Sequence, residues 1–192
     1  MKGYLKISAV LAVIAFVCAA ILAGLNMVTS PIIAKNNEAK ETQTIKAIYE
    51  DYDSTKSTST TSEGAITKKI IAKDSNGAML GTVYIVTGKN AYGTITLMVA
   101  IAPNNTVHQV EFLENGQSFA GTVKTHVKSN YNSSKEEVYE LNPYSNGEQK
   151  EIDDLTEAEV NGIDVKCGAT YGATLVKELV NVALADAKGG NQ

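Results

Sequence analysis

Hydrophobic residues are spread very unevenly along the chain. Residues 7–28 form one apolar run without a charged side chain. A helix over this run is about 33 Å long, enough to cross the hydrocarbon core of a bilayer. Lys2 and Lys6 precede the run and favour a cytoplasmic N-terminus. We therefore expect a cytoplasmic N-terminus at 1–6, one transmembrane helix at 7–28, and the rest of the chain outside the cytoplasm.

A cleaved signal peptide is the alternative interpretation of this apolar run. Signal peptides have a shorter apolar core, of about 7–15 residues, followed by a small-residue cleavage site. Only Ala19 and Ala20 resemble such a site here. A lipid anchor at Cys18 is not favoured, because Val17 stands where a small residue is needed. A membrane-spanning anchor is the interpretation that the run supports best.

A second helix is expected over 31–52, and a loop after it. Pro31 suits the first turn of a helix, and apolar side chains recur at helical spacing: Ile45, Ile48, Tyr49 and Tyr52. Residues 53–65 are rich in Ser and Thr, which predicts a flexible or surface loop. Region 29–65 would then be a stalk helix and a loop, or a helix packed on the domain that follows.

Residues 66–192 have the pattern of one folded domain. Strands with short turns between them are expected at 66–74, 78–88, 92–103 and 106–114. Residues 118–131 fit a helix or a loop, and 132–150 are polar. Thr156 and Glu159 have capping-box spacing, and 171–187 has a wide apolar helical face. The predicted fold class is α+β: one transmembrane helix, then a twisted antiparallel sheet packed with helices.

Composition excludes several classes of function. The net charge is -4 and no basic patch is visible, which argues against nucleic-acid binding. The chain has no Cys/His spacing typical of zinc, and we expect no metal site. His108 is expected to face solvent, and His126 lacks a recognisable triad partner. The acidic pairs Glu136–Glu137 and Asp153–Asp154 are expected to be solvated loop charges.

The segment IDVKCGATYGATLVKELV, at 163–180, carries the candidate chemistry. Gly168 and Ala169 allow another group to approach the backbone just before a predicted helix. The free N–H groups and the dipole of a helix N-terminus favour a phosphate there, and Thr170 adds a hydroxyl. The alternative is a plain helix start in which Thr170 is the N-cap. Cys167 as a nucleophile lacks a partnered base in the sequence.

The motif Asp164-x-x-Cys167-Gly168-Ala169-Thr170 resembles D-x-x-[S/T]-G-A-T, the flavinylation motif of the FMN-binding domain family. That family includes the G subunit of the Rnf electron-transport complex and the C subunit of the sodium-pumping NADH:quinone reductase. The resemblance extends to the N-terminal helix ending LAGLNMVTSPI and to residues 88–115. It implies that a flavin transferase joins FMN through its phosphate to Thr170. It also implies flavin-side roles for Tyr92 and Gly93.

Three departures from the family pattern stand out. Cys167 replaces a hydroxyl residue, and a thiol is a weaker hydrogen-bond donor. The repeat Tyr171-Gly172-Ala173-Thr174 offers Thr174 as a second acceptor, although Asp164 lies at the right distance from Thr170. The sequence ENGQSFAG, at 114–121, stands where the family has a Glu-Thr-Pro-Gly loop, with Gln117-Ser118 in place of Glu-Thr.

The resemblance implies a membrane-anchored electron carrier, a redox subunit of an Rnf-type ion-translocating complex rather than an independent enzyme. Its partners would be the other membrane subunits and the flavin transferase. Residues 7–28 hold no charge, so this chain alone would not form the ion path. A stand-alone extracytoplasmic flavoprotein serving outside acceptors is the alternative. A non-redox surface domain with the same anchor is the alternative from another class.

Overall fold

The computed structural model describes residues 2–62, 64–132 and 154–189, with side chains from residue 7 onward. It divides into two compact units, Met1–Thr42 and Gln43–Gln192. The first unit is the apolar part of helix α1 (Lys2–Ile48). This is the one described helix that is long and apolar enough to cross a membrane, and its apolar stretch is not buried in the protein. A membrane anchor and a signal sequence both have these properties.

The prediction of a separate helix starting at Pro31 is wrong. Helix α1 runs without a break through Pro31 and ends at Ile48. A proline inside a helix removes one backbone N–H donor, while the turns on either side keep their own hydrogen bonds. The Thr29 hydroxyl donates to the Leu25 carbonyl at 2.9 Å in the turn before the proline. The loss is therefore local and does not end the helix.

The second unit is built on one five-stranded antiparallel sheet in which neighbours in sequence are neighbours in space. Its strands are β1 (Thr58–Thr61), β2 (Ile66–Lys73), β3 (Met79–Asn90), β4 (Gly93–Ile101) and β5 (Val107–Asn115). The α+β class and the four predicted strands are confirmed. The prediction of a loop at 53–65 is wrong over β1. The side chains of β1 are exposed and polar, so they give no strand pattern in the sequence, and the strand is held by backbone pairing to β2.

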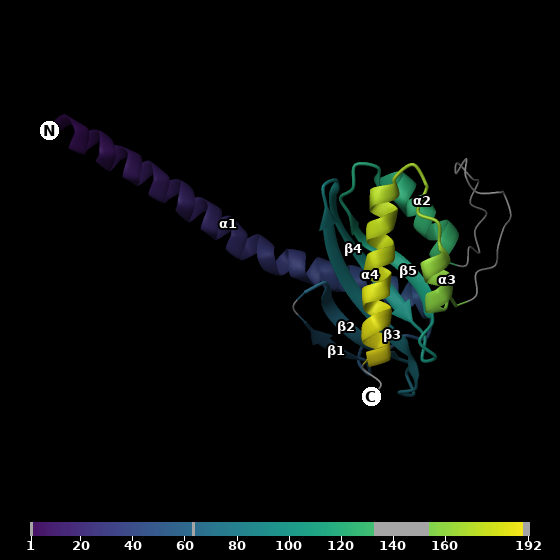
Figure 1. Ribbon diagram of the computed structural model, residues 1–192. Coiled ribbons are helices and arrows are strands. Elements are labelled where there is room, and N and C mark those ends of the chain that lie inside the picture. Colours follow the sequence, from purple (N-terminus) through teal and green to yellow (C-terminus); the bar gives the residue numbers. More distant parts are fainter. Residues whose placement is uncertain (1, 63, 133–153, 190–192) are drawn as a thin grey trace. The chain divides into compact units, whose positions relative to one another are not determined.

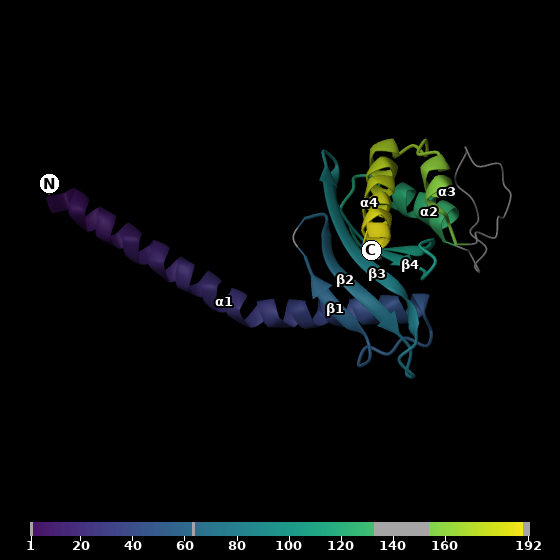
Figure 2. The same ribbon diagram turned by 60° about the horizontal axis from the view of Figure 1, so that its bottom comes forward.

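Successive side chains of the central strands point to opposite faces of the sheet and pack into two separate apolar layers. Tyr84 and Val86 of β3 face one layer, whereas Val83 and Ile85 face the other. The first layer is covered by α2 (Ala120–Tyr131), α3 (Glu157–Gly162) and α4 (Thr170–Gly189), which lie together on one face of the sheet (Figures 1 and 2). The second layer is covered by the end of α1 and the residues after it, Ile45, Ile48 and Tyr52.

Helices α2, α3 and α4 agree with the sequence predictions, except for one residue of the predicted apolar face of α4. Residues 118–131, for which helix and loop both remained open, contain α2. The capping box of α3 is present, with Thr156 and Glu159 bonded reciprocally as predicted. Helix α4 buries most of its predicted apolar face, but Val182 is 37% exposed and is not part of the core. The predicted polar segment 132–150 lies outside the described residues except for Asn132.

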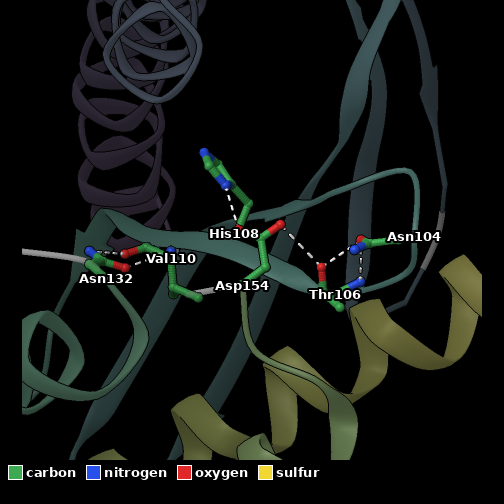
Figure 3. Close-up of polar contacts among 6 residues, drawn as sticks. All are labelled: Asn104, Thr106, His108, Val110, Asn132 and Asp154. Carbon is green, nitrogen blue, oxygen red and sulfur yellow. Dashed lines mark hydrogen bonds and ion pairs between the residues drawn. The ribbon is translucent and has the colours of Figure 1, made fainter. Parts of the chain in front are cut away.

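The outer edge of β5 is partly covered by residues that follow it in the chain. The Asn132 side chain accepts from the Val110 N–H and donates to the Val110 carbonyl, both at 2.8 Å, as a strand residue would (Figure 3). Leu155 forms a β-bridge with Val107. These contacts blunt the edge and hold the segment that leads into α3.

Candidate functional site

The site begins at the first turn of α4. Gly168 has a φ of 76°, a left-handed conformation that glycine adopts readily. The Ala169 carbonyl then accepts the N–H groups of Gly172 at 2.9 Å and Ala173 at 3.1 Å, so Ala169 occupies the N-cap position. Thr170 is the first helical residue and is exposed. The interpretation of Thr170 as the N-cap is therefore wrong, and Thr170 is an exposed residue of the first turn.

A cavity of about 280 Å³ opens beside this turn. It is lined by residues from the β3–β4 turn, the segment around α2 and the start of α4: Tyr92, Gln117, Phe119, Val123, Gly168, Ala169, Thr170, Tyr171 and Gly172. Among the described residues of the second unit, the exposed large apolar side chains are Met79, Tyr92, Phe119, Tyr171 and Val182. Three of these five line this cavity, with exposures of 45%, 62% and 68% for Tyr92, Phe119 and Tyr171. Exposed aromatic side chains gathered around one cavity are typical of a ligand site.

The β3–β4 turn is fixed to the start of α4. The Tyr92 and Tyr171 rings lie 5.3 Å apart, tilted by 31°. The Asn90 amide donates to the Tyr171 carbonyl at 3.1 Å, and the Asn90 Oδ1 accepts from the Tyr92 N–H at 2.8 Å. A single asparagine thus holds both sides of the aromatic pair.

Gln117 is a buried polar side chain in the cavity wall. Its Nε2 donates to the Asn90 Oδ1 at 3.1 Å and to the Gly93 carbonyl at 2.7 Å. These two acceptors fix the orientation of the Gln117 amide. Its Oε1 then lies beside Gly172, 3.4 Å from the position that a Cβ on this glycine would take. Gly93 has a φ of 140°, and a Cβ there would come within 2.0 Å of the Gly116 carbonyl oxygen. Only glycine therefore fits at position 93, where the backbone carbonyl accepts the Gln117 hydrogen bond.

The back of the cavity depends on a close approach of α2 and α4. A Cβ at Gly172 would stand 2.5 Å from a Val123 methyl group, so only glycine fits without a shift. The small residue that the sequence places in the first turn of α4 is thus explained by packing against α2.

The structure brings some predicted site residues together and leaves others apart. Tyr92, Gly168, Ala169 and Thr170 line the cavity. Cys167, Asp164 and Gly93 are not among its lining residues. Cys167 is buried in the core layer below α4, and Asp164 is exposed, with its carboxylate accepting the Lys166 N–H at 3.0 Å.

The sequence interpretation assigned no role to Asn90, Phe119 or Val123 in this site. Phe119 lies in the segment 114–121, which the resemblance places where the family has its Glu-Thr-Pro-Gly loop, but no role was assigned to this residue. Val123 and Asn90 enter the site only through the folded contacts of α2 and the β3–β4 turn. Asn90 lies in the predicted turn between the strands at 78–88 and 92–103, which was the one available hint for it.

The two histidines have structural contacts outside the cavity. His108 was expected to face solvent, which is wrong in part. Its Nδ1 lies 2.8 Å from the Asp154 Oδ1 (Figure 3), and its ring stacks on Tyr49 at 5.3 Å. Asp154 also accepts from the Thr106 hydroxyl at 3.2 Å. His126 is buried, and burial lowers the pKa of its imidazole, while Asp164 acts in the opposite direction.

Two family matches account for most of the chain. Residues 2–48 match the RnfG N-terminal region, and residues 91–185 match the FMN-binding domain. The chain is an RnfG-like FMN-binding protein. The matched domain begins at the β3–β4 turn and contains every lining residue of the cavity. The RnfG region coincides with α1 and indicates membership of an Rnf complex. No curated protein matches the chain.

The cavity residues fit an FMN that is only partly enclosed. Ligand pockets commonly measure about 300–1,000 Å³, so this cavity lies just below that range and would hold part of the cofactor. The start of α4 offers backbone N–H groups to a phosphate, and the exposed rings at the rim offer apolar contact to a flat heterocycle. The described residues contain no cluster of His, Cys, Asp or Glu suited to a metal ion.

Proposed function

We propose that this protein is a membrane-anchored electron carrier whose FMN is bonded through its phosphate to Thr170, and that it passes electrons within an Rnf-type ion-translocating complex. The observation that carries the proposal is the position of Thr170. This exposed hydroxyl residue lies at a helix N-terminus and on the rim of a cavity ringed by three exposed aromatic side chains.

Each part of the site would have a distinct task. The N–H groups of the first turn of α4 would donate hydrogen bonds to the phosphate oxygens, and the helix dipole would favour the negative charge there. Tyr92, Phe119 and Tyr171 would pack against the ring system and shield it from water. Gln117, held by Gly93 and Asn90, would present its Oε1 as a hydrogen-bond acceptor in the wall. FMN supplies the electron chemistry, and the protein sets its surroundings.

The attachment step balances with a flavin dinucleotide as donor. The Thr170 Oγ1 forms a bond to the flavin-side phosphorus and loses its proton. The phosphoanhydride bond of the donor breaks, and a nucleoside monophosphate leaves. The product carries FMN less water. A covalent tether suits a carrier outside the cytoplasm, where a lost flavin would not easily be replaced.

The anchor would keep this carrier beside its partners. Helix α1 has no charged residue between residues 7 and 28, so the ion path would lie in other subunits. The RnfG region over this helix supports a place among those subunits.

Affinity purification of the tagged full chain from membranes of its native host tests the proposal. We expect flavin fluorescence that stays with the chain on a denaturing gel, together with co-purifying integral membrane subunits. Covalent flavin without other subunits would favour the stand-alone carrier. Neither flavin nor subunits in native membranes would contradict the proposal and favour a non-redox surface domain.

A further inference from the structure

Lys177 connects α4 to the segment that leads into the attachment motif. Its ammonium group donates to the Asn161 carbonyl at 2.6 Å and to the Ile163 carbonyl at 2.9 Å. Both carbonyls lie at the C-terminal end of α3, where backbone acceptors have no partner inside the helix. A cation is favoured there because the helix dipole places partial negative charge at this end. The contact is therefore a charge-assisted cap of α3 supplied by α4.

These two hydrogen bonds close a loop around the motif. The chain leaves α3 at Ile163 and enters α4 at Thr170, and Lys177 stands about two helical turns farther along α4. Inside the loop, the bonds are local: Asp164 accepts the Lys166 N–H, and the Cys167 N–H donates to the Val165 carbonyl at 3.0 Å. Ile163, Val165 and Cys167 also pack against the core, and the two Lys177 bonds add a polar attachment to α4 at the start of the loop.

Other residues of α4 also hold α3, but at different points. The Asn181 amide donates to the Asn161 Oδ1 at 2.9 Å, and Lys188 pairs with Glu157 in the first turn of α3. Lys177 differs from both because it bonds the backbone carbonyl directly before Asp164. Lys188 is thus a matched control, a lysine of the same helix that contacts the same partner helix away from the motif.

We propose that Lys177 is a positioning residue for flavin attachment. It holds the loop 163–169 against α4, so that Asp164 and Thr170 are presented to the flavin transferase in one fixed arrangement. Lys177 does not line the cavity and acts through the loop. This inference rests on the proposed function, since it concerns how the acceptor threonine is displayed.

The test follows flavin incorporation into the detergent-solubilised full chain by a flavin transferase, with a flavin dinucleotide as donor. We expect Lys177→Met to slow incorporation about tenfold or more, because small misplacements of a reacting group are costly. Lys177→Arg should retain most of the rate, since a guanidinium also donates to carbonyls. Lys188→Met should incorporate flavin at the rate of the unmodified protein.

Amide hydrogen exchange in the unflavinylated chain supplies a second readout. We expect faster exchange at Lys166 and Cys167 in Lys177→Met, with β3 and β4 unchanged. If Lys177→Met does not fold, Lys177→Leu, which also lacks a donor, replaces it with the same expectations.

Equal incorporation rates for Lys177→Met and the unmodified chain would overturn this inference and leave the proposed function intact. So would a slower rate without a change in exchange at Lys166 and Cys167. An unmodified chain that takes up no flavin at Thr170 would contradict the proposed function, and this inference with it.

Discussion

The rings of Tyr92 and Tyr171 lie 5.3 Å apart, although one follows β3 and the other stands in the first turn of α4. Both side chains are exposed, and both line the cavity next to Thr170. The contact joins the β3–β4 turn to the attachment motif. Under the proposed function, these two rings would pack against the flavin.

Tyr171→Leu is expected to weaken the hold on the flavin ring. An aromatic pair contributes about 0.5–1.5 kcal/mol beyond its buried area, which corresponds to roughly a two- to tenfold loss in affinity. Binding of free FMN to the Thr170→Ala chain, with and without Tyr171→Leu, measures this loss through quenching of flavin fluorescence. Met79→Ala removes an exposed apolar side chain outside the cavity and should leave the affinity unchanged. An equal effect of both substitutions would contradict the assignment.

Gly93→Ala is expected to destabilise the domain by at least about 2 kcal/mol. A Cβ would collide with the Gly116 carbonyl oxygen, and the φ of 140° is unfavourable for alanine. Gly121→Ala is the control, because this residue lies in α2 with open space around it. It should raise stability by about 0.5–1 kcal/mol. Urea unfolding measures the free energy of unfolding of both variants. Changes of the same sign in the two variants would refute the packing argument.

Tyr49 should make the stability of the domain sensitive to high pH. Burial, with a smaller contribution from Asp154, raises the pKa of Tyr49 from 10.0 to about 12. The unfolded chain therefore releases this proton first as the pH rises, so stability present below pH 10 is lost between pH 10 and about 12. Tyr49→Phe should lose less stability over that range in urea unfolding series. Its hydroxyl is buried without a hydrogen-bond partner among the described residues, so the variant should be at least as stable at neutral pH.

His126 should make the stability of the domain sensitive to acid pH. Burial lowers its pKa below 6.5, so the unfolded chain binds a proton more readily than the folded one. Stability is then fully present above pH 6.5 and falls as the pH drops below it. Thermal unfolding between pH 5 and 8 should show a flatter profile for His126→Leu than for the unmodified chain. Parallel profiles would mean that another group causes the acid loss.

Much of the sheet was predictable because burial leaves a mark on the sequence. β3 and β4 are covered on both faces, and their apolar residues stand out clearly. β1 was missed because its four exposed Ser and Thr residues contribute backbone pairing alone. The continuation of α1 through Pro31 was missed because a proline predicts a boundary locally, while the turns on either side sustain the helix.

The site was predictable only where local sequence decides local conformation. Gly168 and the start of α4 follow from the motif itself, and the turn between the strands at 78–88 and 92–103 follows from the strand pattern. Phe119 and Val123 belong to the cavity because α2 packs beside Gly172, a long-range contact that no spacing in the sequence encodes. Asp164 belongs to the motif but not to the cavity lining, since its carboxylate turns back to the Lys166 N–H.

The most direct test of the central claim is the intact mass of the chain purified from its native host, compared with Thr170→Ala, Thr170→Ser and Thr174→Ala. We expect an added mass of one FMN less water in the unmodified chain, in Thr170→Ser and in Thr174→Ala, and none in Thr170→Ala. An adduct that survives Thr170→Ala but disappears in Thr174→Ala would contradict the assignment of Thr170 as the attachment residue. Native material without any adduct would contradict covalent attachment itself.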